Sequence, residues 1–522
     1  MSLHGEFFGT ARRCWGQLAI ADSTGQRLTY GRALTAVLLF ARKIRRLTPD
    51  QRMVGLLLPA SAGGALANIA TLAAGRVPVN LNFTAGEDSM AVAVERCGIR
   101  TIITSKVFLA KAGIQMKPTP AGSAAPELVF LEDMRRSIGV LDKVRAALDA
   151  RLRPLASLGR RYGPIASDTD LATVIFSSGS TGAPKGVMLS HRNILANIDG
   201  FADIFPMTAD DCFIGVLPFF HSFGLTGTLW YPLLSGCAVA FHPNPMDAKV
   251  VGELAATYKG TMLIATPTFA QAYLRRCTRQ EFAHLHHVVV GAEKLRPALD
   301  AAFRERFGIG LTEGYGCTEM SPVVAVNEAH AGTPTPSRPG SVGRPIKGVE
   351  AKIVDQHTFE GPLVDHEGLL LVRGDSLMLG YLGEADRTAE VMRDGWYVTG
   401  DIGTIDADGF LTITDRLSRF SKIGGEMVPH LKIEDAINDI LGETAAAVTA
   451  VPDEARGERL VAFYTTADVS PAQIWERLNR SDLPKLWLPR RDSILRTDAI
   501  PTLGSGKVDL RALRARALTS AG

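Results

Sequence analysis

Short apolar runs alternate with helix-like segments through the first two thirds of the chain. One run covers residues 54–58, stops at Pro59, and is followed by an alanine-rich segment with helical spacing that ends near Gly75. This order predicts a strand, a loop, a helix and a second strand. Similar apolar runs occur at residues 101–104, 173–176, 213–217, 261–265 and 287–290. Continuous apolar strands that alternate with helices are typical of buried, mostly parallel sheets.

The pattern changes near residue 340. Turns rich in glycine and proline there separate shorter apolar runs such as EAKIVD, GLLLVRG and GFLTITD, which predict a more antiparallel β subdomain. Helix and strand patterns return after Arg416, over a length that suits one compact domain. We therefore predict an α/β protein with a large N-terminal domain of mixed or parallel sheets, helices and a β subdomain over residues 1–415, and a small α+β domain over residues 416–522.

The composition is that of a globular protein, with 46% hydrophobic and 21% charged residues in a chain of 522. The net charge of +3 is too close to balance to indicate a nucleic-acid-binding protein. Six cysteines are scattered without a CxxC pair, which favours a reducing cytoplasm. The sequence has neither a signal-peptide pattern nor eighteen consecutive apolar residues, so we expect neither secretion nor a membrane span.

Residues 132–162 form a helix-like stretch that is rich in arginine and lysine and has an apolar face. Two interpretations stay open for it. It is either a solvated surface helix, or an interfacial helix that places the protein peripherally on anionic lipid at the inner face of the membrane.

A loop of small residues follows the apolar run at 173–176, and it reads SSGSTGAPKG over residues 177–186. Small residues let backbone N–H groups and hydroxyls approach polyphosphate oxygens, while Lys185 adds a positive charge. The GxxxxGK[ST] spacing of a Walker A loop is absent, which disfavours a P-loop ATPase or kinase. A flexible linker is the alternative. The candidate phosphate-binding residues are Ser177, Ser178, Gly179, Ser180, Thr181, Gly182 and Lys185.

The loop resembles the phosphate loop of the adenylate-forming superfamily, which comprises acyl-CoA synthetases, firefly-type luciferases and adenylation domains. Four further segments agree with that superfamily in order and spacing: GYGCTEMSP at 314–322, GWYVTGDIG at 395–403, DRLSRFSKIGGEMV at 415–428 and PTLGSGKVD at 501–509. The resemblance covers nearly the whole chain. It implies an AMP-forming acid–thiol ligase that uses ATP and Mg²⁺, with a small, mobile C-terminal domain.

The resemblance also implies roles for individual residues. Thr318 and Glu319 are expected beside the α-phosphate, with Glu319 holding magnesium, and a carboxylate oxygen is a hard ligand that suits this cation. Asp401 is expected to accept hydrogen bonds from the ribose hydroxyls, and Arg416 to reach the same sugar. Around the adenine, the resemblance implies contacts from Tyr315 and from Gly291, Ala292, Glu293, Gly314 and Gly316.

Five further positions are assigned by the same resemblance. His221 corresponds to a site between the nucleotide and acyl pockets, with a buried structural histidine as the alternative. Lys507 corresponds to the mobile catalytic lysine that stabilises charge during adenylation, and Ser418 to the hinge. Gly424 and Gly425 are implied to line the pantetheine tunnel, where glycine allows close backbone approach.

Three strings narrow the resemblance to bacterial acyl-acyl-carrier-protein synthetases: GRVPVNLNFTAG, FLEDMRRSIGVLDKVRA and RFSKIGGEMVP. They imply a medium- or long-chain fatty acid as substrate and acyl carrier protein as the favoured acceptor. Basic residues between 480 and 516 suit an acidic carrier protein. Two alternatives stay open: a fatty acyl-CoA ligase that uses CoA, and a non-catalytic acyl- or nucleotide-binding protein that retained the fold.

Overall fold

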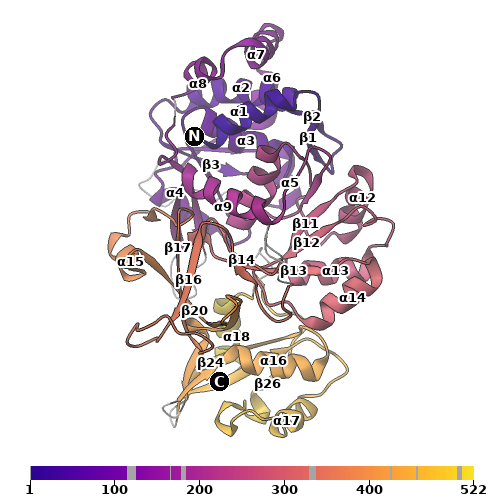
Figure 1. The fold of residues 1–522 in the computed structure, drawn as a ribbon, viewed down its shortest axis with the longest axis vertical. Coiled ribbons are helices and arrows are strands. Elements are labelled where there is room, and N and C mark those ends of the chain that lie inside the picture. The colour runs from indigo at the N-terminus through magenta and orange to yellow at the C-terminus, as the bar shows by residue number, and fades with distance from the viewer. Residues whose placement is uncertain are drawn as a thin grey trace. The chain divides into compact units, whose positions relative to one another are not determined.

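The computed structural model describes residues 2–114, 125–164, 166–177, 184–328, 337–423, 426–453, 456–502 and 508–521 (Figure 1). The chain divides into two compact units. The first comprises Met1–Gly179, Ala183–Ala351 and Val372–Tyr397, and the second comprises Lys352–Leu371 and Val398–Gly522.

The largest sheet of the first unit has nine strands within the described residues, in the order β15-β14-β13-β12-β11-β9-β10-β1-β2. Strands β1 and β9 to β13 pair in parallel, whereas β2, β14 and β15 are antiparallel additions at the two edges. The strands are β1 (Leu18–Asp22), β2 (Arg27–Thr29), β9 (Cys212–Gly215), β10 (Ala238–Phe241), β11 (Met262–Ala265), β12 (His287–Val290), β13 (Leu311–Gly316), β14 (Val323–Val326) and β15 (Arg344–Pro345). Their connecting helices include α9 (His191–Ile204), α12 (Ala248–Tyr258), α13 (Pro267–Arg276) and α14 (Pro297–Phe307).

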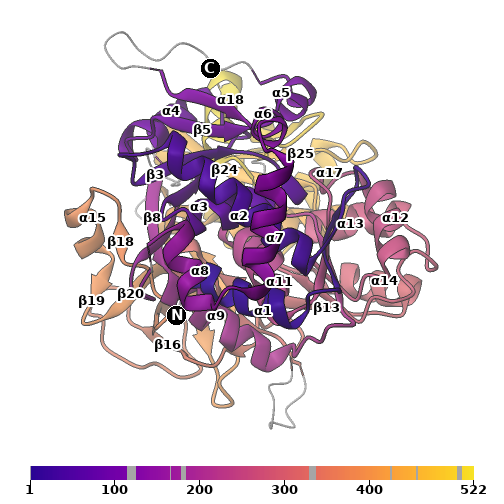
Figure 2. The ribbon, with the colours of Figure 1, turned by 90° about the horizontal axis from the view of Figure 1, so that it is seen from above.

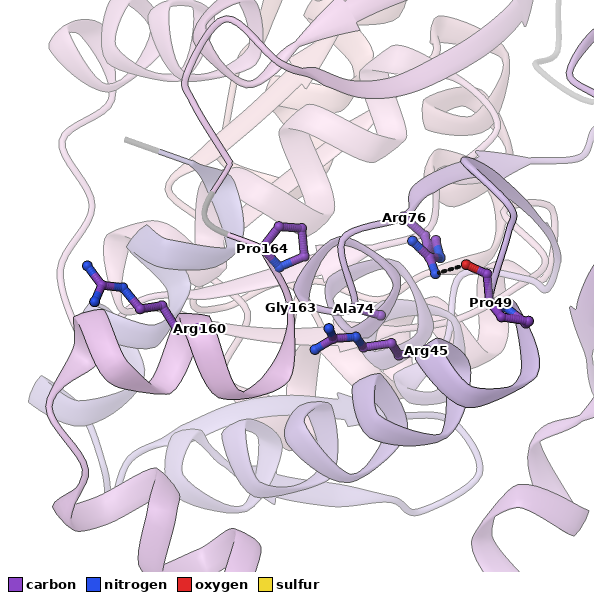
Figure 3. Close-up of a pocket in the computed structure, with 7 residues that line it drawn as sticks. All are labelled: Arg45, Pro49, Ala74, Arg76, Arg160, Gly163 and Pro164. Atoms are coloured by element: carbon purple, nitrogen blue, oxygen red, sulfur yellow. Dashed lines mark hydrogen bonds between the residues drawn. The ribbon is translucent and has the colours of Figure 1, made fainter.

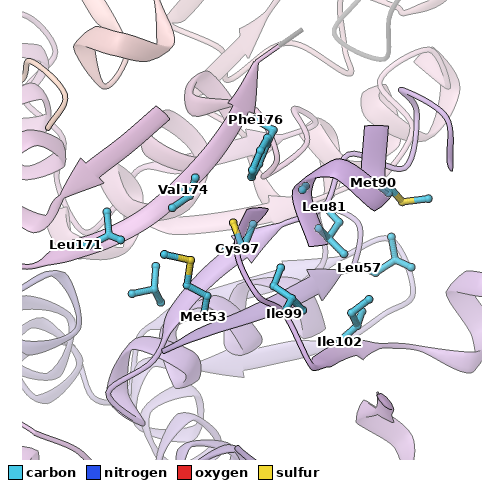
Figure 4. Packing of buried hydrophobic residues seen from close by; sticks show 13 residues of the cluster. Met53, Leu57, Leu81, Met90, Cys97, Ile99, Ile102, Leu171, Val174 and Phe176 are labelled. Atoms are coloured by element: carbon cyan, nitrogen blue, oxygen red, sulfur yellow. The ribbon is translucent and has the colours of Figure 1, made fainter. Parts of the chain in front are cut away.

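A second sheet of this unit is parallel and has the order β4-β3-β5-β6 in the described part of the chain. Its strands are β3 (Met53–Leu57), β4 (Val77–Asn80), β5 (Thr101–Thr104) and β6 (Glu127–Phe130), with helices α1 (Leu3–Arg13), α2 (Tyr30–Leu47), α3 (Ala62–Ala73), α4 (Glu87–Arg96) and α5 (Lys106–Ala112) nearby in sequence. Met53, Leu57 and Ile102 of this sheet belong to one buried cluster with Val174 and Phe176 (Figure 4). The apolar runs at 54–58 and 101–104 therefore form buried parallel strands, as the sequence pattern predicts.

Strand β7 (Leu171–Ser177) departs from the predicted strand–helix alternation. It pairs antiparallel with β8 (Lys185–Ser190), which also pairs antiparallel with β18 (Gly380–Tyr381). The connection between β7 and β8 is too short for the crossover that a parallel pair requires, so a hairpin forms. The helix that the pattern places after this strand begins only after β8, as α9.

The basic stretch at 132–162 folds as three helices: α6 (Leu131–Arg136), α7 (Val140–Leu152) and α8 (Leu155–Tyr162). Helices α7 and α8 both contact α2, as Figure 2 shows. In the part of the chain that the model describes, none of the helices has the length and apolar character needed to cross a bilayer.

The second unit contains an antiparallel sheet in the order β23-β22-β25-β24, with β26 added in parallel to β25. Helices α16 and α17 contribute to the core on one side of this sheet, and α18 contributes to a separate core cluster with β24 and β25. Its elements are β22 (Phe420–Ile423), β23 (Glu426–Pro429), α16 (His430–Leu441), β24 (Ala446–Asp453), β25 (Gly457–Tyr464), α17 (Pro471–Asn479), β26 (Ile494–Arg496) and α18 (Leu510–Ala521).

Three strands pass from one unit to the other: β16 (Val349–Val354), β17 (Gly368–Gly374) and β20 (Trp396–Ile405). The division therefore runs through the β subdomain. The boundary between residues 415 and 416 lies inside the second unit and stays a prediction about which part of the chain moves.

Candidate functional site

The phosphate-binding loop predicted from the sequence connects β7 to β8. Ser177 and Lys185, the first and last residues predicted to bind phosphate, are cross-strand partners in this hairpin. The hairpin therefore fixes the two ends of the loop. The Lys185 ammonium lies 5.0 Å from the centre of the Tyr381 ring, on the neighbouring strand β18.

Arg96, at the C-terminus of α4, also contacts the end of this loop. Its Nη1 donates a hydrogen bond of 3.3 Å to the carbonyl oxygen of Pro184, and the same guanidinium forms an ion pair with Glu384. The sequence gives no local signal for this contact, because residues 96, 184 and 384 are distant along the chain. Arg96 therefore contacts the C-terminal end of the loop that is predicted to bind phosphate.

Thr318 and Glu319 lie on one turn of 3-10 helix, Thr318–Met320, directly after β13. The Asn197 side chain of α9 donates hydrogen bonds to the carbonyl oxygens of Met320 and Val323, at 3.0 and 2.8 Å. A glycine is required just before this turn, since a Cβ on Gly316 would stand 2.1 Å from the Pro322 carbonyl oxygen. The Asn197 side chain and the close approach of Gly316 to Pro322 therefore hold the turn in place.

Glu319 is 8% exposed and is oriented by two tyrosines. The Tyr381 hydroxyl donates a 2.9 Å hydrogen bond to Glu319 Oε1, and Tyr381 in turn shares a hydrogen bond with Tyr397. Burial and the nearby Glu319 carboxylate raise the pKa of both tyrosines, so both hydroxyls keep their protons. Sequence reasoning missed Tyr381 and Tyr397, because neither lies in a segment that points to Glu319.

The donor set at Glu319 suits magnesium. Its Oε1 accepts the tyrosine hydroxyl, which leaves Oε2 as the oxygen that can bind a hard cation. Among the described residues, no group of three or more His, Cys, Asp or Glu side chains is placed to hold a metal. A single carboxylate is compatible with Mg²⁺, which commonly takes most of its ligands from water and substrate phosphates.

His221 lies in the segment before α10 (Ser222–Gly224), and its ring packs edge-on against Phe220 at 4.8 Å between centroids. The next residue, Ser222, donates a 3.3 Å hydrogen bond to the Thr318 hydroxyl. The structure thus brings the His221 segment to the Thr318–Glu319 turn. The packing of His221 against Phe220 is also compatible with the alternative that His221 is a structural histidine.

Gly291 and Gly314 bring two neighbouring strand ends together. A Cβ on Gly291 would approach the Gly314 carbonyl oxygen at 3.0 Å, so the small residue allows this contact. Ala292 has a positive φ of 71°. Glu293 Oε2 accepts hydrogen bonds from the backbone N–H and the hydroxyl of Thr268. At least one carboxylate oxygen of Glu293 therefore caps the start of α13.

Glu313 precedes Gly314 on β13 and is 7% exposed. Burial raises its pKa to about 7, although its Oε1 accepts a 2.9 Å hydrogen bond from the Leu295 backbone N–H, which favours the charged form. No sequence motif singles out this residue.

Asp401 and Arg416 meet within the second unit. They are cross-strand partners on β20 and β21 (Leu411–Arg416), and Arg416 Nε lies 3.1 Å from Asp401 Oδ1. Asp401 is 8% exposed, whereas the Arg416 side chain is about half exposed. The two residues predicted to bind one sugar are therefore adjacent.

Several predicted site residues lie outside the described residues, and their roles stay predictions. These are Ser178, Gly179, Ser180, Thr181, Gly182, Gly424, Gly425 and Lys507. The backbone of Ser418 lies in the turn Leu417–Arg419 after β21, but its side chain is outside the description.

Comparison with known proteins decides the family, because a model of the AMP-binding enzyme family matches residues 7–382. The chain belongs to the AMP-binding enzyme family. This places it in the adenylate-forming superfamily, and its homologues include acyl-CoA ligases.

Two curated relatives illustrate the range of this family. The chain is 32% identical to 4-coumarate–CoA ligase 2 of Oryza sativa subsp. japonica, over 67% of this chain but only 63% of that enzyme. It is 28% identical to the long-chain-fatty-acid–CoA ligase of Bacillus subtilis (strain 168), over 94% of this chain and 90% of that enzyme.

A solved structure agrees with the fold along nearly the whole chain. O-succinylbenzoate coenzyme A synthetase from Bacillus subtilis, in complex with ATP and magnesium ion, matches with a TM-score of 0.80. The match covers 98% of this chain and 99% of that one, at 20% identity. This member of the AMP-binding enzyme family therefore has the predicted fold class, an α/β architecture of parallel and mixed sheets.

Proposed function

We propose that the chain activates a medium- or long-chain fatty acid with ATP to acyl-AMP, and then transfers the acyl group to a phosphopantetheine thiol. The observation that carries this proposal is the buried Glu319 carboxylate, which Tyr381 orients, with Lys185 at the ring of the same tyrosine. A positive charge and an ordered carboxylate around one tyrosine form a site that can hold Mg²⁺ and the phosphates of a nucleotide.

In the first half-reaction, a carboxylate oxygen of the fatty acid attacks the α-phosphorus of ATP. The new P–O bond forms as the bond to the β-phosphate oxygen breaks, so pyrophosphate leaves. Lys185 binds the phosphates at one end of the loop, and Asp401 accepts hydrogen bonds from the ribose hydroxyls. Lys507 donates hydrogen bonds to the oxygens on which charge develops. Glu319 would hold magnesium, which would supply positive charge to neutralise the phosphates.

In the second half-reaction, the thiolate sulfur attacks the acyl carbonyl carbon of acyl-AMP. The C–S bond forms, the C–O bond to the phosphate breaks, and AMP leaves with that oxygen. We propose that residues 416–522 move about Ser418 between the two half-reactions, with Gly424 and Gly425 lining the path of the pantetheine arm. This motion removes Lys507 from the site after adenylation.

Two observations support a fatty acid as the substrate. Local strings resemble acyl-acyl-carrier-protein synthetases, and the Bacillus subtilis relative that aligns over 94% of this chain carries the name long-chain-fatty-acid–CoA ligase. Aromatic acids are the competing class, since the rice relative is named for 4-coumarate. A substrate panel must therefore include both classes.

Acyl carrier protein is the acceptor that we propose, with CoA as the alternative. The second unit presents exposed basic residues that suit an acidic carrier, although some have internal partners. Arg490 pairs with Asp453 at 3.0 Å, and Arg516 donates to Thr497 Oγ1 at 2.8 Å. The exposed basic residues are Arg480, Lys485, Arg490, Arg491, Arg496, Arg511, Arg514 and Arg516. The names of both relatives favour CoA instead.

The deciding experiment supplies ATP, magnesium and a panel of fatty and aromatic acids, with either CoA or acyl carrier protein, and identifies the thioester by mass spectrometry. We expect fatty acyl thioesters, a higher kcat/KM with carrier protein, and a steep fall in that value at high salt. The double variant Arg490→Glu/Arg491→Glu should lower carrier-protein use far more than CoA use. A preference for CoA at every salt concentration would identify an acyl-CoA ligase instead.

A further inference from the structure

Helix α7 exposes its large apolar residues to solvent. Five of them are between 51% and 75% exposed, whereas Ala146 and Ala150 of the same helix are buried. The usual arrangement of a surface helix is the opposite, with the large apolar side chains against the core. The exposed residues, called the apolar stripe below, are Val140, Leu141, Val144, Leu148 and Leu152.

The stripe follows the helical repeat. Successive residues of an α-helix are separated by about 100° around its axis, so Val144, Leu148 and Leu152 lie on one side, with Ala146 and Ala150 on the opposite side. At about 1.5 Å per residue, the stripe is about 18 Å long. Figures 1 and 2 both show α7 next to α2, the helix that it contacts.

Contacts at both ends of α7 fix this orientation. Asp142 pairs with Arg42 of α2 at 2.7 Å, and Arg12 of α1 donates a 2.9 Å hydrogen bond to the Ala150 carbonyl oxygen. The Arg151 guanidinium also lies 5.1 Å from the centre of the Trp15 ring. The helix is thus held so that its leucines face outward.

Basic residues surround the stripe. Residues 140–162 contain six basic and two acidic side chains, and residues 42–47 of α2 contain four basic and no acidic ones. Both acidic side chains are already engaged with arginines: Asp142 with Arg42, and Asp149 with Arg153 and Arg161 at 2.8 Å each. This face therefore carries an excess of positive charge.

Two open clefts on this face have arginine linings. One, of about 600 Å³, is lined by Arg45, Arg76 and Arg160 together with Pro49, Ala74 and Pro164 (Figure 3). The other, of about 480 Å³, lies between α2 and α7 and shares Arg45. Arg76 already donates hydrogen bonds to the carbonyl oxygens of Thr48 and Pro49. The guanidinium groups of Arg45 and Arg160 suit phosphate groups, which arginine binds by charge-assisted hydrogen bonds.

We propose that the face formed by α7, α8 and the C-terminal half of α2 docks on an anionic phospholipid bilayer. The apolar stripe enters the boundary between headgroups and acyl chains, and the flanking arginines contact the lipid phosphates, as in an interfacial amphipathic helix. A second copy of the chain fits this face less well, because a symmetric pairing would set two strongly basic surfaces against each other.

The test is co-sedimentation of the full chain with vesicles, without ATP or fatty acid, so that its outcome is independent of the proposed activity. Vesicles of phosphatidylglycerol with phosphatidylcholine should bind the protein, and vesicles of phosphatidylcholine alone should bind it much less. Leu148→Glu/Leu152→Glu should weaken binding to the anionic vesicles by about tenfold or more. Met246→Glu/Leu518→Glu is the matched control, because it adds the same two charges at apolar residues that are 54% and 51% exposed and lie outside the stripe, and it should bind nearly as the wild type does.

A charge-reversal pair tests the arginines. Arg45→Glu/Arg160→Glu should also weaken binding, whereas Lys249→Glu/Lys347→Glu, which changes the net charge equally at two exposed lysines elsewhere, should have a much smaller effect. Circular dichroism verifies folding of each variant. Equal vesicle binding by Leu148→Glu/Leu152→Glu and Met246→Glu/Leu518→Glu would overturn the proposal. So would a change in oligomeric mass, by light scattering, in the stripe variant with unchanged vesicle binding.

Discussion

The Tyr381 hydroxyl donates a hydrogen bond of 2.9 Å to Glu319 Oε1. Because this bond occupies one carboxylate oxygen and fixes the plane of the group, Oε2 is held in one direction. Mutation of a residue that orients a metal ligand typically lowers metal affinity by about 10- to 100-fold. The pair therefore links strand β18 to the magnesium dependence of the proposed reaction.

Tyr381→Phe should raise the magnesium concentration needed for half-maximal adenylation by about tenfold, the usual order for loss of a residue that orients a metal ligand. Tyr273→Phe is the control, since it also removes a buried hydroxyl that donates a hydrogen bond, in this case to the Pro245 carbonyl oxygen. Titration of magnesium against pyrophosphate exchange decides the matter. An equal magnesium requirement in both variants would show that Tyr381 does not orient the magnesium ligand.

Glu319→Gln should raise the requirement for magnesium and ATP more strongly than Tyr381→Phe does, because it removes the charge that faces the cation while keeping an acceptor for the tyrosine. The thermal unfolding temperature should change little. A large loss of stability with unchanged magnesium dependence would show that Glu319 serves packing alone.

Lys507→Ala should slow adenylation by about a hundredfold or more, the usual order for loss of one donor to developing charge. Thioester formation from supplied acyl-adenylate should be largely preserved, because the proposed role of this lysine is confined to the first half-reaction. Measuring adenylation by pyrophosphate exchange, and thioester formation from supplied acyl-adenylate, separates the two steps. Equal losses in both would contradict the proposed division of roles.

Glu313 should make the stability of the chain depend on pH. Its pKa is raised by burial to about 7 in the folded protein, from an ordinary value of 4.5, so the folded state binds the additional proton between these values. The stabilising contribution is complete below about pH 4.5 and is lost as the pH rises through 7. As the pH rises from 4.5 to 7, the free energy of unfolding of Glu313→Gln should increase by on the order of 3 kcal/mol relative to that of the wild type. Urea unfolding of both proteins at each pH measures this difference, and a difference independent of pH would contradict the account.

The apolar pattern predicted individual strands well where burial alone determines them. Strands β5 and β12 have the predicted bounds, since both lie within parallel sheets. The antiparallel pairing of β7 was missed because it depends on a short connection and not on the strand's own residues. Strands β20 and β21 place Asp401 and Arg416 side by side, and their shared role at the ribose stays a prediction.

Contacts between distant segments were beyond sequence reasoning. Tyr381 lies 62 positions after Glu319 in the chain, and no local motif joins the two. Arg96 reaches Pro184 across 88 positions for the same reason. The apolar face of residues 140–152 was visible in the sequence, but its direction toward solvent depends on how α7 packs on α2.

The most direct test of the central claim is exchange of labelled pyrophosphate into ATP in the presence of single acids, without any thiol acceptor. The account predicts exchange that depends on magnesium and on a medium- or long-chain fatty acid, and that falls about a hundredfold or more in Lys507→Ala. Folded protein that shows no exchange with any such acid would contradict the proposed adenylation.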